Sequence, residues 1–98
     1  MSEDDWSIPT PAFKPAEALV QLKRSLRELK LAERGEGFEF KARRVVELKA
    51  ESEQLVVRLA KRPALSPEWE TKTLKSAAEV RHFVDEVRRR LPRWEQDD

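Results

Sequence analysis

Cysteine and tyrosine are missing from this chain, and histidine occurs once, at His82. Without cysteine the protein has neither a disulfide framework nor a thiolate nucleophile. Because the absence of cysteine fits a reducing compartment, we expect a cytoplasmic location. No Ser–His–acid motif includes His82, which lies beside the apolar stripe of a predicted helix and not on it. We therefore expect that the protein is not an enzyme, and we assign no catalytic residue.

Glycine is almost as rare, because the chain has only Gly35 and Gly37. A phosphate-binding loop needs several glycines ahead of a helix, whereas these two follow one. Metal sites need Cys, His or carboxylate ligands at a suitable spacing, and the sequence has neither a His-x-x-x-His pair nor an Asp-x-Asp loop. We therefore expect no cofactor and no metal.

Long apolar runs are also absent, since none approaches the ~20 residues that a transmembrane helix needs. The first five residues are acidic and lack the apolar stretch of a secretory signal. We therefore expect no membrane partner. A length of 98 residues predicts one small domain.

Charge is abundant in this sequence, and its distribution is uneven. Of the 19 acidic residues, six lie in residues 1–13 and 95–98, which contain no base. All 20 lysines and arginines lie between Lys14 and Arg93 beside the other 13 acids, so the body carries +7 although the chain carries +1. We predict an acidic, proline-containing arm over 1–13, one domain over 14–94 and an acidic tail over 95–98. A basic body favours an anionic partner.

Residues 15–33 have the spacing of an amphipathic helix. Pro15 suits the first helical position, and Gly35 is a natural stop. The apolar face consists of Leu19, Leu22, Leu26 and Leu29. A basic stripe runs beside it.

Residues 77–91 predict a second helix. Ser76 and Glu79 form a capping box ahead of it, and Pro92 is expected to end it. Its apolar stripe consists of Val80, Phe83, Val84, Val87 and Leu91.

Residues 38–61 fit two structures. As strands they place alternate apolar side chains on one face, namely Phe38, Phe40, Val46, Leu48, Ala50, Leu55, Val57 and Leu59. As a helix they contain a 3-4-3-4 repeat through Val45, Leu48, Ser52, Leu55 and Leu59. We favour strands, because phenylalanine and valine are enriched in strands and because Ser52 would occupy a buried position of the helix. Residues 69–74 alternate in the same way and predict a last strand.

The predicted fold class is therefore α+β, with a small antiparallel sheet of three to four strands flanked by N-terminal and C-terminal helices. Each helix has one apolar face and so does the sheet, which favours both helices on the same sheet face. The alternative is an all-α protein of three helices, in which residues 40–62 are helical.

Three tryptophans in so small a chain suggest a protein-binding patch: Trp6, Trp69 and Trp94. The competing interpretation is that they cover the ends of a small core. The absence of chemistry and the peripheral tryptophans favour a protein-interaction module, with an unknown protein partner or with self-association through a sheet edge or the tryptophans.

The alternative function is nucleic-acid binding through basic residues of the helices, with acidic tails that restrain non-specific binding. The candidate residues are Lys23, Arg27, Lys30, Arg34, Arg88, Arg89 and Arg93. A base-stacking sheet face is not expected, because the outward positions are mixed in sign and contain no aromatic residue. These positions are Glu39, Lys41, Arg43, Glu47, Lys49 and Arg58.

Overall fold

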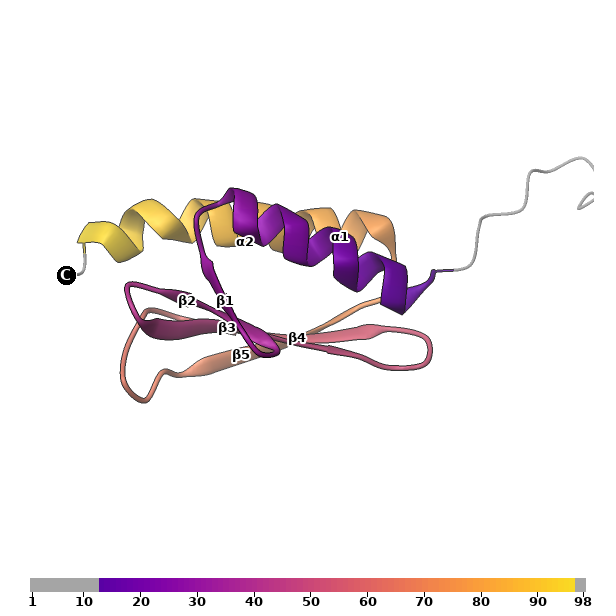
Figure 1. The fold of residues 1–98 in the computed structure, drawn as a ribbon, viewed down its shortest axis with the longest axis horizontal. Coiled ribbons are helices and arrows are strands. Elements are labelled where there is room, and N and C mark those ends of the chain that lie inside the picture. The colour runs from indigo at the N-terminus through magenta and orange to yellow at the C-terminus, as the bar shows by residue number, and fades with distance from the viewer. Residues whose placement is uncertain (1–12, 97–98) are drawn as a thin grey trace, which may run out of the picture.

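The computed structural model describes residues 13–96. Two helices cover one face of a five-stranded antiparallel sheet, which leaves the other face open (Figure 1). The elements are α1 (Pro15–Glu28), β1 (Ala32–Arg34), β2 (Gly37–Phe40), β3 (Arg43–Ala50), β4 (Leu55–Ala60), β5 (Trp69–Leu74) and α2 (Ala77–Gln96). The α+β class is confirmed, with five strands where three to four were predicted, and the three-helix alternative is excluded.

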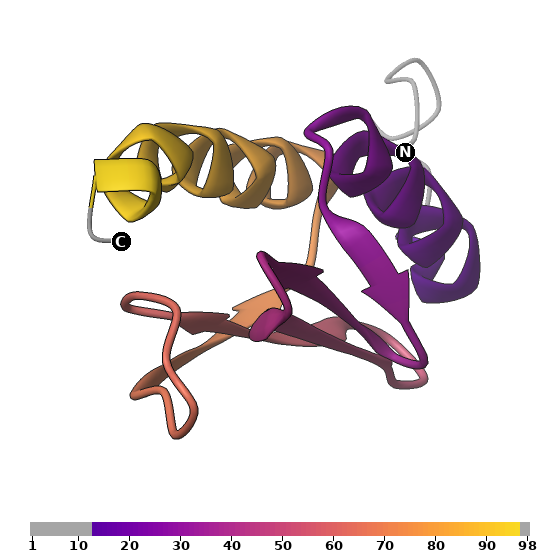
Figure 2. The same cartoon turned by 60° about the vertical axis from the view of Figure 1, so that its left-hand side comes forward.

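The strands follow one another in space as in sequence, from β1 to β5, and each pairs with its neighbours antiparallel. Figure 2 shows both helices on the same side of this sheet. The predicted alternation sets the inner face: Phe38 lies opposite Val46, and Leu48 lies opposite Val57. All four side chains are buried. Ala50, at the end of β3, is exposed although the alternation placed it inside.

A bulge in β3 changes this alternation at one point. Val46 pairs with Phe38, but the next residue of β2, Glu39, pairs with Arg44, so Val45 has no partner. Val45 and Val46 are therefore both fully buried although they are adjacent. Arg44 shares the face of Glu39, which the simple alternation had assigned to Arg43.

The first helix ends at Glu28, five residues earlier than predicted. Lys30 has a φ of 73°, and its N–H donates to the Arg27 carbonyl at 3.0 Å, which closes the last turn. Residues 32–34 form β1, the additional strand. Gly35, with a φ of 59°, then serves the β1–β2 turn and not the helix end. Pairing with β2 thus replaces the last helical turn.

The second helix continues through Pro92 to Gln96, so the prediction that the proline ends it was wrong. A proline inside a helix removes one backbone hydrogen bond, but packing of the next turn offsets this loss. Trp94 is 1% exposed, its Nε1 donates to the Lys61 carbonyl at 3.2 Å, and its ring lies 5.8 Å from that of Phe40. Glu95 and Gln96, assigned to a tail from the sequence, are part of this helix.

Arg90 connects α2 to the sheet through hydrogen bonds. Its guanidinium donates to the Ala60 carbonyl at 3.0 Å, to Glu70 at 2.6 Å and to Glu86 at 2.9 Å, and its side chain is 13% exposed. The hydrogen bond from Arg90 holds the pKa of Glu70 below its ordinary value, against the opposing effect of burial. Hydrogen bonds from Arg89 and Arg90 lower the pKa of Glu86 in the same way.

Candidate functional site

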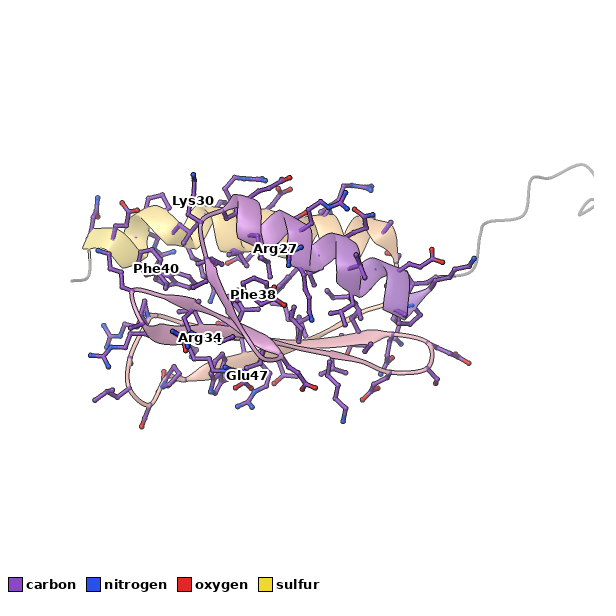
Figure 3. All side chains as sticks on the ribbon, viewed as in Figure 1. Arg27, Lys30, Arg34, Phe38, Phe40 and Glu47 are labelled. Carbon is purple, nitrogen blue, oxygen red and sulfur yellow. The ribbon has the colours of Figure 1, made fainter. Side chains whose placement is uncertain are left out.

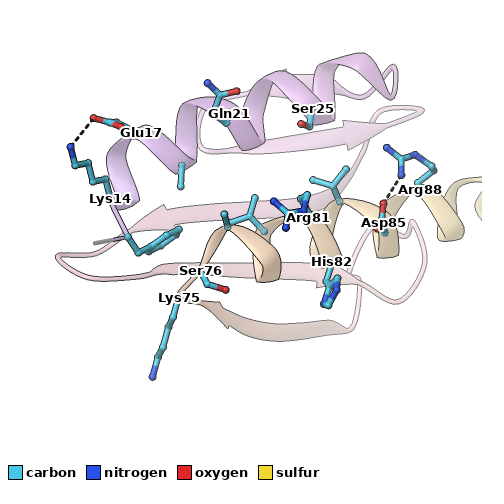
Figure 4. A pocket seen from close by; sticks show the side chains of 15 residues that line it. Lys14, Glu17, Gln21, Ser25, Lys75, Ser76, Arg81, His82, Asp85 and Arg88 are labelled. Carbon is cyan, nitrogen blue, oxygen red and sulfur yellow. Dashed lines mark hydrogen bonds and ion pairs between the residues drawn. The ribbon is translucent and has the colours of Figure 1, made fainter. Parts of the chain in front are cut away.

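A groove of about 1100 Å³ lies between α1 and α2 (Figure 4). The walls come from the sides of the two helices that face each other, at the margin of their buried stripes. One wall begins at Lys14, just ahead of α1, and follows Ala18, Gln21 and Ser25; on α2 the other wall follows Ala77, Arg81, Val84 and Arg88. Each set has the 4-3-4 spacing of one helical face.

Small and buried side chains make this groove hollow and apolar at its base. Ala18 and Ala77 project only a methyl group from the two walls, so the helices leave space between them. Val80 and Val84 of α2 are buried and contribute apolar surface, and the half-buried Phe13 closes one end. A partner that enters the groove therefore meets apolar atoms between charged rims.

The rims of the groove carry an excess of positive charge. Four bases and two acids line it, and two of the bases are neutralised locally. Lys14 lies 3.9 Å from Glu17, and Arg88 lies 2.5 Å from Asp85. These pairs appear as dashed lines in Figure 4. The remaining bases are Lys75 and Arg81.

Lys75 and Arg81 are exposed, and neither forms an ion pair within residues 13–96. Figure 4 shows Arg81 between the two helices, whereas Lys75 points away from α1. Arg81 is thus the cation best placed to meet an anionic group inside the groove. A guanidinium that is available above an apolar base suits a ligand that combines a carboxylate with apolar side chains.

His82 also lines this groove, where it is exposed. Asp85 lies on the same wall, but its carboxylate accepts from Arg88 and not from the imidazole. The described residues contain no cluster of three or more potential metal ligands. Within the same residues, no helix has both the length and the apolarity to cross a membrane.

Trp69 and Trp94, the two predicted tryptophans within the described residues, do not form one surface patch. Trp94 is buried, as expected for a residue that covers the end of the core. Trp69 is half-buried at the start of β5, and Arg58 lies 4.8 Å above its ring. Trp6 lies outside the described residues.

Most of the predicted basic residues are engaged by acids. Glu33 of β1 pairs with Lys23 at 3.5 Å and with Arg27 at 2.7 Å. The hydrogen bond from Arg27 lowers the pKa of Glu33 below its ordinary value. The other pairs are Arg34–Glu39 at 3.8 Å, Arg88–Asp85 at 2.5 Å and Arg89–Glu86 at 2.7 Å.

Lys30 and Arg93 alone of the seven lack an acidic partner within residues 13–96. Lys30 and Arg34 also lie beyond the end of α1, so the basic stripe predicted beside the leucines ends at Arg27. Figure 3 shows Arg27 and Lys30 at the level of the helices and Arg34 at the level of the sheet. Arg34 is thus separated from Arg27 and Lys30.

The open face of the sheet carries an aromatic residue, Trp69, although the predicted outward positions contained none. Register with β4 puts Trp69 and Thr71 on the face of Arg58, and Glu70 on the helix side. Glu47 accepts from Arg44 at 3.1 Å and from Arg58 at 2.8 Å on this face. The alternation of residues 69–74 shows two faces, but it does not reveal which of them is turned toward the helices.

The groove residues Arg81 and Lys75 were also missed, because periodicity identifies the buried stripe of a helix and not the use of its flank. The small residues Ala18 and Ala77 were the available signal. Comparison of the chain with protein-family models, with curated proteins and with solved structures found no match.

Proposed function

We propose that this protein is a non-enzymatic, cytoplasmic interaction module that binds an acidic, amphipathic segment of a partner protein in the groove between α1 and α2. The observation that carries the proposal is the Arg81 guanidinium, which has no acidic partner within residues 13–96 and lies beside the apolar base of the groove. Charge complementarity selects an acidic partner, and the apolar base requires that the same segment carry apolar side chains.

The size of the groove is compatible with such a segment. Its volume of about 1100 Å³ exceeds what one side chain fills and suits several anchor residues of a short peptide. Each apolar anchor that is fully buried contributes ~1.5–3 kcal/mol before the cost of ordering the peptide. An amphipathic helix laid between two helices presents its anchors at the matching spacing.

Selection from a random peptide library on phage tests this proposal without a known partner. We expect the enriched peptides to combine Asp or Glu with Leu, Phe or Trp at helical spacing. Arg81→Glu should weaken a selected peptide by about tenfold or more, measured by fluorescence anisotropy. Arg43→Glu is the matched control, because Arg43 is exposed on β3 outside the groove and the charge change is the same.

Two results would overturn the proposal: a library with no enriched sequence, or peptides that bind the Arg81→Glu and Arg43→Glu variants equally well. Nucleic-acid binding, the alternative function, is examined by titration with single- and double-stranded DNA and RNA over a salt series. Binding that falls steeply with salt and is unchanged by Arg81→Glu would favour that alternative. The engagement of most candidate bases by acids argues against it.

A further inference from the structure

The strand β5 is the long free edge of the sheet. It pairs with β4 on one side, and within residues 13–96 no backbone hydrogen bond joins its other side to another segment. The opposite edge, β1, has only three residues, whereas β5 has six. Residues 71–73 are exposed along it. An edge of this kind presents a row of amide and carbonyl groups to any strand that fits.

Charges on an edge strand normally prevent such pairing, and β5 carries Glu70 and Lys72. Here, however, the two charges lie on either side of Thr71 at equal distance, and register with β4 places both on the helix side. The sequence Trp69-Glu70-Thr71-Lys72-Thr73 is therefore complementary to itself when it runs antiparallel.

We propose that β5 pairs antiparallel with β5 of a second copy of this chain, with Thr71 on the two-fold axis. Thr71 then faces Thr71 of the other copy. Glu70 of each copy faces Lys72 of the other, and Trp69 of each copy faces Thr73 of the other. Opposite charges, two threonines, and an aromatic ring with a β-branched side chain are each favourable cross-strand pairs. The result is a continuous ten-stranded sheet with all four helices on one side.

Charge also selects this register among its neighbours. In an antiparallel pair, residues opposite each other point to the same face of the sheet. A two-fold axis perpendicular to the sheet therefore has to pass through a residue that pairs with its own copy, because an axis between two residues would pair side chains from opposite faces. Centring on Glu70 places two carboxylates on the axis, and centring on Lys72 places two ammonium groups there; both arrangements are destabilising. Only the register centred on Thr71 satisfies every charge.

The side-chain contacts within one chain leave these groups able to pair. Glu70 uses Oε1 for Arg90, and no contact within residues 13–96 engages its Oε2. Lys72 forms no ion pair within residues 13–96 and is exposed. The charges needed for this register are therefore present and oriented by the existing sheet.

Substitutions on the axis test the proposal. Thr71 is exposed and lies on the open face opposite Arg58, so its replacement leaves the core intact. We expect wild-type protein to be a dimer by light scattering during size exclusion at high micromolar concentration. Thr71→Glu and Thr71→Lys each place like charges on the axis and should weaken the dimer about tenfold or more.

An equimolar mixture of the two variants should restore a heterodimer, because opposite charges then meet on the axis. Native mass spectrometry with one variant labelled by ¹⁵N distinguishes it from homodimers. Thr73→Glu and Thr73→Lys are the controls, since Thr73 faces Trp69 in the proposed register, and both should remain dimers. A monomeric wild type, an unchanged dimer of the Thr71 variants, or a mixture that stays monomeric would overturn the register. Circular dichroism verifies folding.

This interface is separate from the groove. Residues of β5 do not line the groove, so Thr71→Glu should leave peptide binding unchanged. Loss of the dimer with retained peptide binding, or the reverse, therefore separates the two proposals.

Discussion

At the scale of the residue, Arg90 illustrates how one long side chain joins three elements. Its hydrogen bonds reach the Ala60 carbonyl on β4, Glu70 on β5 and Glu86 within α2. Burial disfavours the charged guanidinium, but the hydrogen bonds to the two carboxylates outweigh it, and the pKa of Arg90 is raised. The described residues leave no buried side-chain nitrogen or oxygen without a partner.

Replacement of Arg90 by alanine should therefore destabilise the protein by ~2–3 kcal/mol, because it leaves a half-buried carboxylate and a carbonyl without their donor. Arg89→Ala is the control. Its side chain is 69% exposed and bonds only to Glu86, so the loss should stay within ~0.5 kcal/mol. Urea unfolding followed by circular dichroism measures both, and equal losses would contradict the role given to Arg90.

At the scale of the element, the close approach of β2 to β3 depends on Gly37. A Cβ on Gly37 would lie 2.4 Å from the Val46 carbonyl and 2.7 Å from the Arg44 guanidinium. The absence of a side chain thus allows Arg44 to cross β2, where it donates to the Arg34 carbonyl at 3.2 Å.

Gly37→Ala should consequently cost ~1–3 kcal/mol, because backbone must move to admit the methyl group. Gly35→Asn is a suitable comparison: nothing lies within 4 Å of its Cβ position, and asparagine tolerates the positive φ of that turn. Its effect should be well under 1 kcal/mol. Denaturation midpoints compare the two, and a Gly37→Ala protein as stable as wild type would refute the steric argument.

The elements also show what periodicity can predict. Alternation identified the inner face of β4 and, apart from Val45 and Ala50, that of β3. The capping box was right in part: Ser76 Oγ accepts from the Glu79 N–H at 3.2 Å. The Glu79 carboxylate, however, accepts from Lys75 N–H at 2.6 Å, one residue ahead of the expected donor. Pairing and packing with distant segments determined the rest, which local pattern does not contain.

Contacts with distant segments decide three features that the local pattern does not predict. Residues 32–34 continue the pattern of α1, but pairing with β2 turns them into a strand. Helix α2 continues past Pro92 because Trp94 packs on Phe40. The face of Trp69 is set by its register with Ala60. The groove was missed for a related reason, since it exists only where the flanks of two helices meet.

At the scale of the whole molecule, three carboxylates respond to acid together. The pKa values of Glu33, Glu70 and Glu86 are all lowered from the ordinary 4.5 by hydrogen bonds from arginines. A carboxyl whose folded pKa lies below its unfolded pKa binds protons more readily in the unfolded chain. Its contribution to stability is complete above the unfolded pKa and disappears as the pH falls through the folded value.

The free energy of unfolding should therefore stay level from neutral pH down to about pH 5 and fall below about pH 4.5. Urea denaturation at a series of pH values measures this, at constant ionic strength. The Arg90→Ala protein should show a shallower acid loss, because two of the three lowered pKa values depend on that guanidinium. An equally steep loss in both proteins would show that other carboxyls govern the acid response.

The hydrogen bonds that attach α2 to the sheet also affect when the domain can fold during synthesis. Arg90 and Trp94 bind the carbonyls of Ala60 and Lys61 across 30 and 33 residues of sequence. A nascent chain that has emerged only as far as β5 therefore contains all five strands. It still lacks Arg90 and Trp94, whose N–H groups donate to the two carbonyls at the end of β4. The hydrophobic underside of the sheet stays uncovered on that side until translation has delivered α2, so closure of the domain is a late event in the life of the polypeptide.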